Sequence, residues 1–292
     1  MDLRAIGMGL IFALMWSSAF ATARIIVADA APLHALALRF AISGGIAMAV
    51  ALAMGARPRL APSQWRSVAV FGLLQNAAYL GLNFIAMQWV EASLAVIIAA
   101  AMPLMVAALS WGLRGERLPV LGLAGLAAGF AGVGLIMGTR LTGGADPLGV
   151  VLCVLGALAL AIATLTLRSA SGAQGGVAGL LMIVGLQMLA GSVALAAVAI
   201  PFETPRLTVT PELLAAFAYQ IAIPGLAATL IWFALVRRIG PTRAATFHFL
   251  NPAFGTAIAA VLLGEELGFL DLIGAAVVAG GILAVQISRR TA

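Results

Sequence analysis

The stretch MPLMVAALSWGLRGER, residues 102–117, decides the fold, because its pattern returns later in the chain as NPAFGTAIAAVLLGEE, residues 251–266. One offset of 149 residues, without a gap, aligns Pro103 with Pro252 and also aligns the Gly-Glu pair near the end of each stretch. In a chain rich in Ala and Leu, matching Ala and Leu residues carry little weight, whereas proline and Gly-Glu at the same distance carry more. The sequence therefore predicts two copies of one unit.

The composition predicts an integral membrane protein. The 292 residues are 63% hydrophobic and 9% charged, with a mean hydropathy of +1.14, whereas soluble domains carry roughly 25% charged residues. All 16 basic residues are arginines, and they lie singly or in pairs between apolar runs, so the net charge of +6 does not predict nucleic-acid binding. The single Cys153 excludes an internal disulfide and a cysteine-based metal site.

Ten largely apolar runs are each near the roughly 20 residues that a helix needs to cross about 30 Å of hydrocarbon. The loops between them are too short for a soluble domain. The predicted transmembrane helices are residues 5–24, 33–54, 65–87, 92–113, 118–138, 147–167, 177–200, 213–236, 243–263 and 269–288. The predicted fold class is an all-α integral membrane protein with ten transmembrane helices.

The arginines predict the orientation, because arginine collects on the cytoplasmic side of membrane proteins. If the N-terminus is inside, the inner segments hold twelve of the 16 arginines and the outer segments hold three, with Arg39 inside the second span. The outer segments also take eight of the ten acidic residues. Both termini are therefore predicted to be cytoplasmic.

The two copies would divide the chain into residues 1–143 and 144–292, each with five helices. Because five is odd, the second copy must cross the membrane in the opposite direction to the first. Inverted repeats are typical of carriers that work by alternating access, with the substrate site near the membrane midplane. The first apolar run could be a signal peptide cleaved at Ala21-Thr22-Ala23, but its removal would leave unequal halves, so we expect it to be retained.

The chain resembles the drug/metabolite transporter superfamily, in its ten-helix EamA-type branch. The resemblance rests on Trp16-Ser17-Ser18-Ala19-Phe20, on Pro32 followed by Arg39-Phe40, and on the two prolines with their Gly-Glu pairs. Within that branch the chain is most similar to amino-acid exporters of the YddG type, which are bacterial inner-membrane proteins associated with efflux of aromatic amino acids. The resemblance implies a multi-pass protein of the bacterial inner membrane.

A polar stripe lies in the third span. Gly72, Asn76, Tyr79 and Asn83 step by 4, 3 and 4 residues, which puts them on one helical face, with Gln75 beside it. Polar side chains at membrane depth usually face a cavity or another helix. Hydrogen bonds between helices are one explanation, but three large polar groups on one face favour a wet cavity.

The ninth span repeats this spacing with Ala244, His248, Asn251 and Gly255. His248 is the one ordinary titrating group near mid-membrane, and it either lines the cavity or is a neutral histidine bonded to a neighbouring helix. The equivalent face of the fourth span is apolar, so the predicted site is asymmetric although the scaffold is repeated.

Other polar and aromatic groups at similar depth complete the predicted site. They are Trp16 and Ser17 in the first span and Thr229 and Trp232 in the eighth, although packing is the alternative for one of the tryptophans. Arg39, about seven residues into the second span, either grips a substrate carboxylate or snorkels to the outer headgroups.

Glycines mark the fifth and tenth spans. Gly122, Gly125, Gly129 and Gly132 step by 3, 4 and 3 residues, and two glycines of the tenth span echo them. Small faces allow close helix contact. We interpret these helices as peripheral packing or dimerising elements, which leaves a monomer or a homodimer surrounded by membrane lipids.

The chain lacks an HExxH sequence, a P-loop and paired intramembrane carboxylates, so we expect neither an enzyme nor a cofactor or metal. A carrier of cationic drugs needs an intramembrane acid, and a carrier of phosphosugars needs several basic groups. Amides, hydroxyls, a histidine and aromatic rings instead suit a neutral or zwitterionic solute. The predicted function is export of aromatic or large apolar amino acids; export of other metabolites or drugs, a channel and a lipid-handling scaffold are the alternatives.

Overall fold

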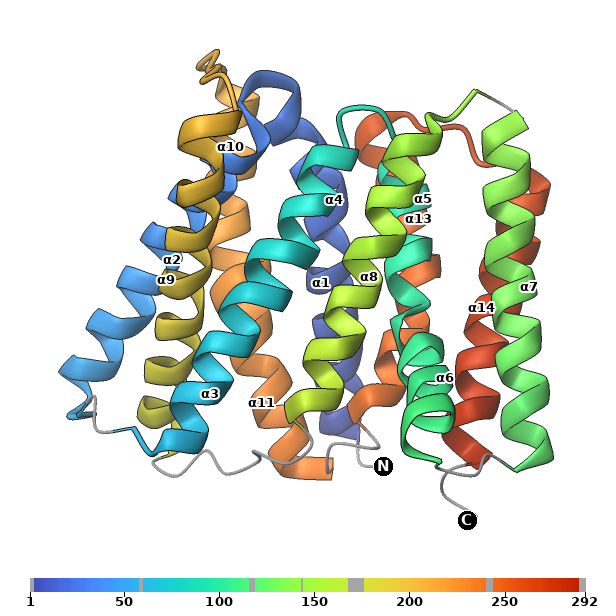
Figure 1. The fold of residues 1–292 in the computed structure, drawn as a ribbon, viewed down its shortest axis with the longest axis horizontal. Coiled ribbons are helices and arrows are strands. Elements are labelled where there is room, and N and C mark those ends of the chain that lie inside the picture. Colours follow the sequence, from blue (N-terminus) through green and yellow to red (C-terminus); the bar gives the residue numbers. More distant parts are fainter. Residues whose placement is uncertain are drawn as a thin grey trace.

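The protein is a bundle of helices that run between two ends (Figure 1). The structure is a computed structural model that describes residues 3–57, 60–115, 119–142, 144–167, 176–239 and 244–288. The described residues are all-helical apart from loops and one isolated antiparallel bridge between Ala30 and Leu207. Glu116 and Arg117 of the first repeated stretch lie outside the described residues.

Six of the predicted spans are single helices whose ends fall within a few residues of the prediction. They are α1 (Leu3–Asp29), α2 (Pro32–Ala53), α7 (Val120–Thr142), α8 (Pro147–Leu167), α9 (Gly176–Phe202) and α14 (Phe269–Ser288). By length and composition, eight helical stretches of the described chain can cross a membrane, and Phe247–Leu263 and Phe269–Val285 are shorter apolar helices. The all-helical membrane fold with ten apolar segments confirms the predicted fold class.

The other four spans are interrupted. The third consists of α3 (Pro62–Val70), the π-helical η1 (Phe71–Tyr79) and α4 (Leu80–Ala86), and the fourth consists of α5 (Ala92–Ala100) and α6 (Met102–Arg114). The eighth consists of α10 (Pro211–Gln220), the π-helical η2 (Ile221–Ala227) and α11 (Ala228–Ile239), and the ninth consists of the 3-10 helix η3 (Ala245–Leu250) and α13 (Asn251–Leu263).

Proline and glycine explain most of these interruptions. Pro224 lies inside η2, where it removes a backbone N–H and crowds the preceding turn, so the turn widens. Pro103 and Pro252 lie in the first turn of α6 and α13, where proline is tolerated, and each ends the segment before it. Gly115 and Gly264 then end these helices in the left-handed region, with φ of 64° and 67°.

The same irregularities recur at the offset of 149 residues. Shifting η1 by this offset gives residues 220–228, which contain η2, and shifting α6 gives residues 251–263, which are α13. A shared break at the same position of two spans is what two copies of one unit would produce. We therefore keep the division into residues 1–143 and 144–292 as a proposal.

The expected glycine faces meet inside the chain, where α7 lies along α14 (Figure 1). A Cβ added to Gly281 would lie 2.6 Å from the carbonyl oxygen of Gly125, and one added to Gly132 would lie 3.0 Å from that of Gly274. These faces serve an intramolecular contact, so a homodimer through the same helices would have to use their other faces. The oligomeric state stays a prediction.

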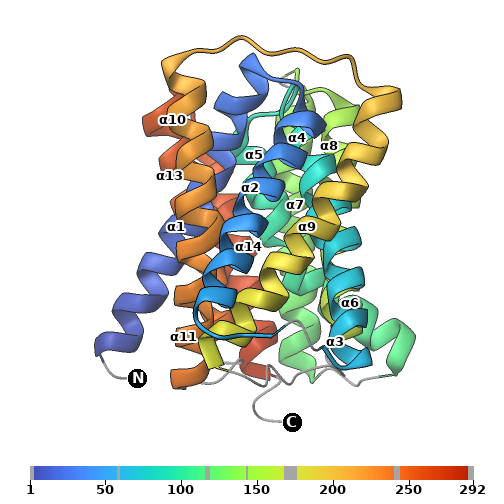
Figure 2. The ribbon, with the colours of Figure 1, turned by 90° about the vertical axis from the view of Figure 1, so that its left-hand side faces the viewer.

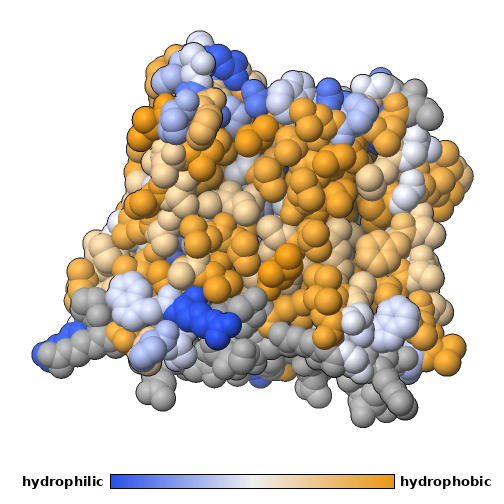
Figure 3. Space-filling model, in the orientation of Figure 1, coloured by the Kyte–Doolittle hydropathy of each residue, from blue (hydrophilic) through white to orange (hydrophobic). Residues whose placement is uncertain are grey.

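The two ends of the bundle differ in charge. Helix α1 begins and α14 ends at one end, and the eight described acidic residues lie at the opposite one, which we call the acidic end (Figure 1). The segment between α9 and α10 crosses the acidic end (Figure 2). An apolar belt covers the middle of the face in Figure 3, and polar atoms gather above and below it. The arginine pattern predicts that the acidic end is periplasmic.

Candidate functional site

A cavity is lined by residues of α1, α2, η1, α4, α9, α10, η2 and α11, and we call it the main cavity. Its polar and aromatic lining includes seven of the residues predicted from the sequence: Trp16, Arg39, Gln75, Asn76, Tyr79, Asn83 and Thr229. No carboxylate of the described chain lines it. The main cavity thus collects amides, hydroxyls and rings around one cation.

A second, smaller cavity shares Trp16, Phe20 and Tyr79 with the main cavity. Its other lining residues come from α5, α6, α8, η3 and α13, and they include His248 and Asn251. The structure therefore divides the predicted site in two. Tyr79 of the polar stripe lines both cavities, whereas Asn76 and Asn83 line the main cavity and His248 and Asn251 line the second one.

The polar stripe of the third span faces inward as expected. Asn76, Tyr79 and Asn83 are almost fully buried and line the main cavity. The amide nitrogen of Asn83 donates to the carbonyl oxygen of Tyr79 at 2.8 Å. Gly72 does not line the cavity but packs against α9, where an added Cβ would lie 2.7 Å from the Cβ of Ala190.

Arg39 points into the protein and lines the main cavity, while its predicted grip on a substrate carboxylate stays a prediction. Arg39 is 5% exposed. It makes no hydrogen bond or ion pair with another described residue. The guanidinium carbon lies 5.1 Å from the ring centre of the adjacent Phe40. The side chain of Arg39 therefore does not extend to the protein surface, as snorkelling to the headgroups would require.

Aromatic rings surround His248. The ring centres of Phe12, Trp16 and Trp232 lie 5.2, 6.2 and 5.0 Å from that of the imidazole, all in edge-on arrangements. Its Nδ1 lies 3.1 Å from the amide nitrogen of Asn251. Because an amide N–H can only donate, Nδ1 accepts and the proton of the neutral imidazole is on Nε2.

Two predicted lining residues are placed differently by the structure. Ser17 is fully buried and lines neither cavity; its hydroxyl donates to the amide oxygen of Asn251 at 3.4 Å and so joins α1 to α13. Trp232 also lines neither cavity, because its ring packs against Phe12 at 4.7 Å and against His248. Both residues position the histidine–asparagine pair.

Gln220 is a lining residue that the sequence interpretation missed. Its amide nitrogen donates to the carbonyl oxygen of Ala19 at 2.7 Å and to the hydroxyl of Thr22 at 3.0 Å. A glutamine inside an apolar span, four residues before Pro224, was the signal that could have found it. The apolar lining residues Phe20, Phe40, Phe84, Met87 and Met188 carry no such signal, because packing residues have the same character.

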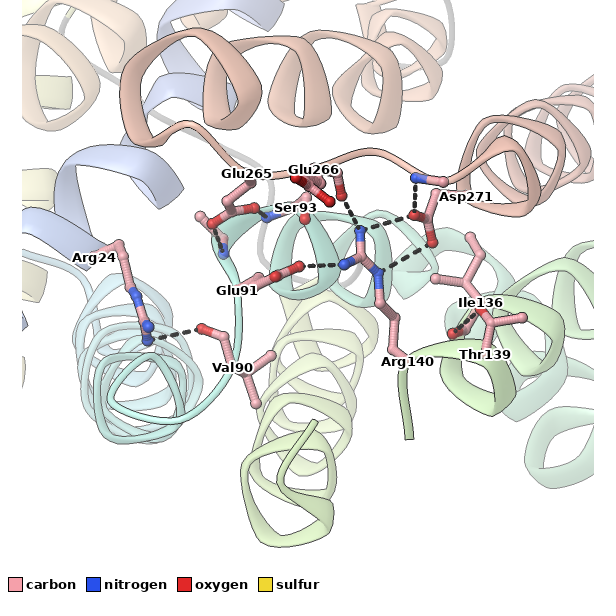
Figure 4. Close-up of polar contacts among 12 residues, drawn as sticks. Arg24, Val90, Glu91, Ser93, Ile136, Thr139, Arg140, Glu265, Glu266 and Asp271 are labelled. Carbon is pink, nitrogen blue, oxygen red and sulfur yellow. Dashed lines mark hydrogen bonds and ion pairs between the residues drawn. The ribbon is translucent and has the colours of Figure 1, made fainter. Parts of the chain in front are cut away.

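A network of ion pairs and hydrogen bonds connects helices at the acidic end (Figure 4). The carboxylate of Glu265 accepts from the backbone N–H groups of Ala92 and Ser93, at 2.7 and 2.9 Å, and so caps the first turn of α5. Arg140 on α7 donates to Asp271 at 2.8 and 3.1 Å and also pairs with Glu91. The contacts of Glu265 with α5 and of Arg140 with Asp271 join segments that lie on either side of residue 144.

Helix α2 is held in a similar way at the same end. The carboxylate of Glu203 accepts from the backbone N–H groups of Leu33 and His34, both at 2.9 Å, and lies 2.6 Å from Nδ1 of His34. Arg206 donates to the carbonyl oxygens of Val27 and Ala28 at the end of α1. The segment after α9 is therefore fastened to α1 and α2.

Burial raises the pKa of Glu91, and the neighbouring carboxylates of Glu265 and Asp271 act in the same direction. Arg140 opposes this shift by favouring the ionised form. Burial, with a smaller contribution from the neighbouring carboxylates, therefore keeps the pKa of Glu91 raised despite its cationic partner.

Long apolar helices, polar ends and an internal polar cavity together define a multi-pass membrane protein of the kind that moves small solutes. The sequence matches the EamA-like transporter family over residues 3–138 and 147–287, and the chain belongs to that family. Its members are transporters.

Relatives with similar sequences are also named as transporters. The chain is 27% identical over 281 residues to the uncharacterized transporter YvbV of Bacillus subtilis, covering 94% of this chain and 88% of the relative. It is 27% identical over 290 residues to the uncharacterized inner membrane transporter YedA of Escherichia coli K12, covering 96% and 90%. A crystal structure titled "Crystal structure of protein" is similar in fold, with a TM-score of 0.68 and 23% identity over 100% of this chain and 99% of that one.

Proposed function

We propose that this transporter exports small neutral or zwitterionic solutes, above all aromatic or large apolar amino acids, from the bacterial cytoplasm by alternating access. The observation that carries this proposal is the main cavity. Helices from both proposed repeats line it, with amide groups and aromatic rings around Arg39 and with no carboxylate among the described residues.

The lining favours this solute class over the alternatives on electrostatic grounds. A desolvated cation needs a nearby acid to offset the loss of hydration, and the cavity supplies none from the described chain. A doubly charged phosphate would meet, among the described lining residues, a single cationic side chain, that of Arg39. Rings and thioethers such as Phe84 and Met188 suit an apolar side chain, while the amides suit polar head groups.

The contacts at the acidic end support alternating access. Glu265 and Asp271 of the second proposed repeat bind α5 and α7 of the first, and Glu203 binds α2. Such contacts can be broken and remade without unfolding a helix. We propose that they hold the periplasmic side closed, and that export requires their release.

Energy coupling follows from where the titrating groups lie. The described carboxylates lie at the acidic end, whereas His248 lines the second cavity. We propose a facilitator, or a carrier weakly coupled to protons through His248. If a His248→Ala variant still concentrated its solute under an imposed pH difference, this view of coupling would be wrong.

Counterflow in proteoliposomes tests the proposed function. Vesicles loaded with unlabelled phenylalanine should accumulate external labelled phenylalanine transiently, and uptake should saturate. A carrier gives this overshoot, whereas a channel or a lipid-handling scaffold does not. Strong inhibition by a quaternary ammonium drug, without inhibition by unlabelled phenylalanine or methionine, would reject amino-acid export.

A further inference from the structure

Three unpaired polar atoms belong to residues that line the main cavity. Nε of Arg39, Oδ1 of Asn83 and Oε1 of Gln220 are buried and have no hydrogen-bond partner among the described residues. Buried polar atoms are paired in the great majority of cases, so each exception needs an explanation. As the side chains stand, these three atoms face protein rather than the open cavity, so a ligand would supply the missing partners once the side chains turn toward it. Three exceptions around one cavity point to such a ligand.

Arg39 requires a negative partner. A guanidinium remains charged in proteins, and burying it without a partner is costly. The described chain offers no carboxylate in this cavity. A ligand carboxylate is the simplest group that fits, because it can accept two parallel hydrogen bonds from one guanidinium.

The two amide oxygens require hydrogen-bond donors. The amide nitrogen of Asn83 faces the carbonyl oxygen of Tyr79, and that of Gln220 faces the carbonyl oxygen of Ala19. Since a carbonyl oxygen can only accept, these contacts fix which amide atom is nitrogen and leave both oxygens as acceptors. An ammonium group, with three N–H donors, can satisfy such acceptors.

Gly225 brings the arginine close to the helix that carries Gln220. A Cβ added to Gly225 would lie 3.8 Å from Nη2 of Arg39 and 2.8 Å from the backbone carbonyl oxygen of Gln220. The widened turn of η2 therefore places Arg39 beside the end of α10. A guanidinium that can donate to a carboxylate and an amide oxygen that can accept from an ammonium thus lie on neighbouring elements.

We propose that Arg39, Asn83 and Gln220 form the head-group site for an α-amino acid. Arg39 binds the carboxylate, the oxygens of Asn83 and Gln220 accept from the ammonium, and the aromatic and thioether lining takes the side chain. This inference rests on the proposed amino-acid transport and adds to it the groups that recognise a zwitterion.

Thermal stabilisation of the purified protein by four probes with the same ring tests the site. The probes are phenylalanine, 3-phenylpropionate without the ammonium, phenylalaninamide without the carboxylate, and phenethylamine with the ammonium alone. Wild type should respond most strongly to phenylalanine, more weakly to 3-phenylpropionate, and not to the two probes that lack a carboxylate.

Variants assign the roles. Arg39→Gln should weaken the response to phenylalanine by about 10-fold or more, the usual effect of a lost hydrogen bond to a charged group, and Arg39→Lys should keep part of it. Gln220→Met should remove the preference for phenylalanine over 3-phenylpropionate. Arg66→Gln, on the exposed surface of α3, is the matched control and should respond as wild type.

The ligand-free protein gives a second measurement. If Arg39 is unpaired until a ligand binds, Arg39→Gln should unfold at a higher temperature than wild type without ligand, because an unpaired buried charge is removed. A purely structural arginine predicts a lower temperature.

The outcomes separate the two proposals. Equal phenylalanine counterflow and stabilisation in wild type and Arg39→Gln would leave export standing and overturn the head-group site. A response of wild type, but not of Arg39→Gln, to 3-phenylpropionate alone would reject amino-acid export and the ammonium site, and would leave Arg39 as a carboxylate site. No response to any probe, together with no counterflow, would overturn both.

Discussion

Replacing Glu265 with Gln should open the acidic end. In the present structure both carboxylate oxygens of Glu265 accept backbone N–H groups of α5, at 2.7 and 2.9 Å. The neutral amide of glutamine has one oxygen for two N–H groups, so one hydrogen bond is lost. The remaining hydrogen bond has a neutral acceptor in place of an ionised one. For a partly exposed cap the loss should be about 1–2 kcal/mol, which corresponds to about a 5- to 30-fold shift toward a state in which α5 is released.

The accessibility of a cysteine in the main cavity measures this shift. In a Cys153→Ala background, Thr229→Cys places a thiol in the cavity lining, and an impermeant maleimide is added from the acidic side. The Glu265→Gln substitution should raise the labelling rate by about 5- to 30-fold, in proportion to the shift toward the released state. Addition of the reagent from the opposite side should give no such rise.

Asp146 supplies the matched control. Its carboxylate caps α8 through the N–H groups of Leu148 and Gly149, at 2.7 and 3.2 Å, so it joins residues of one segment only. Asp146→Asn should lower stability without raising the labelling rate. An unchanged rate in Glu265→Gln, or an equal rise in Asp146→Asn, would refute the role of Glu265 as a link that closes this end.

Three further predictions address packing, pH and orientation. Gly281→Ala should lower the free energy of unfolding by about 1–3 kcal/mol in a chemical denaturation series, because its Cβ meets backbone atoms of α7, whereas Gly280→Ala, with open space, should not. Burial raises the pKa of Glu91, so the ionised form of this carboxyl destabilises the folded protein. The free energy of unfolding of wild type, relative to that of Glu91→Gln, should therefore fall as pH rises from 4.5 through the raised pKa. A difference between the two proteins that does not change with pH would contradict this. Single cysteines at residues 203–206 should react with an impermeant maleimide in intact spheroplasts and those at 57–66 should not, and the reverse pattern would invert the topology.

The sequence determined the membrane fold because its signals are local. Apolar run length identified ten segments, and the structure places their helices within a few residues of the predicted ends. The polar stripe was also visible, since Asn76, Tyr79 and Asn83 share a face whether the turn is α-helical or slightly widened. The prediction of an EamA-type transporter was right, while the narrower resemblance to amino-acid exporters stays a prediction.

Contacts between helices decided the rest. Helical period shows which residues share a face, but it does not show which neighbour that face meets. Ser17 therefore bonds Asn251 and Trp232 packs on Phe12, although both were expected in the cavity. The orientation of Arg39 depended on how α2 lies beside η2, and the pairing of α7 with α14 depended on tertiary packing. These features involve residues far apart in the chain, so only the tertiary structure could fix them.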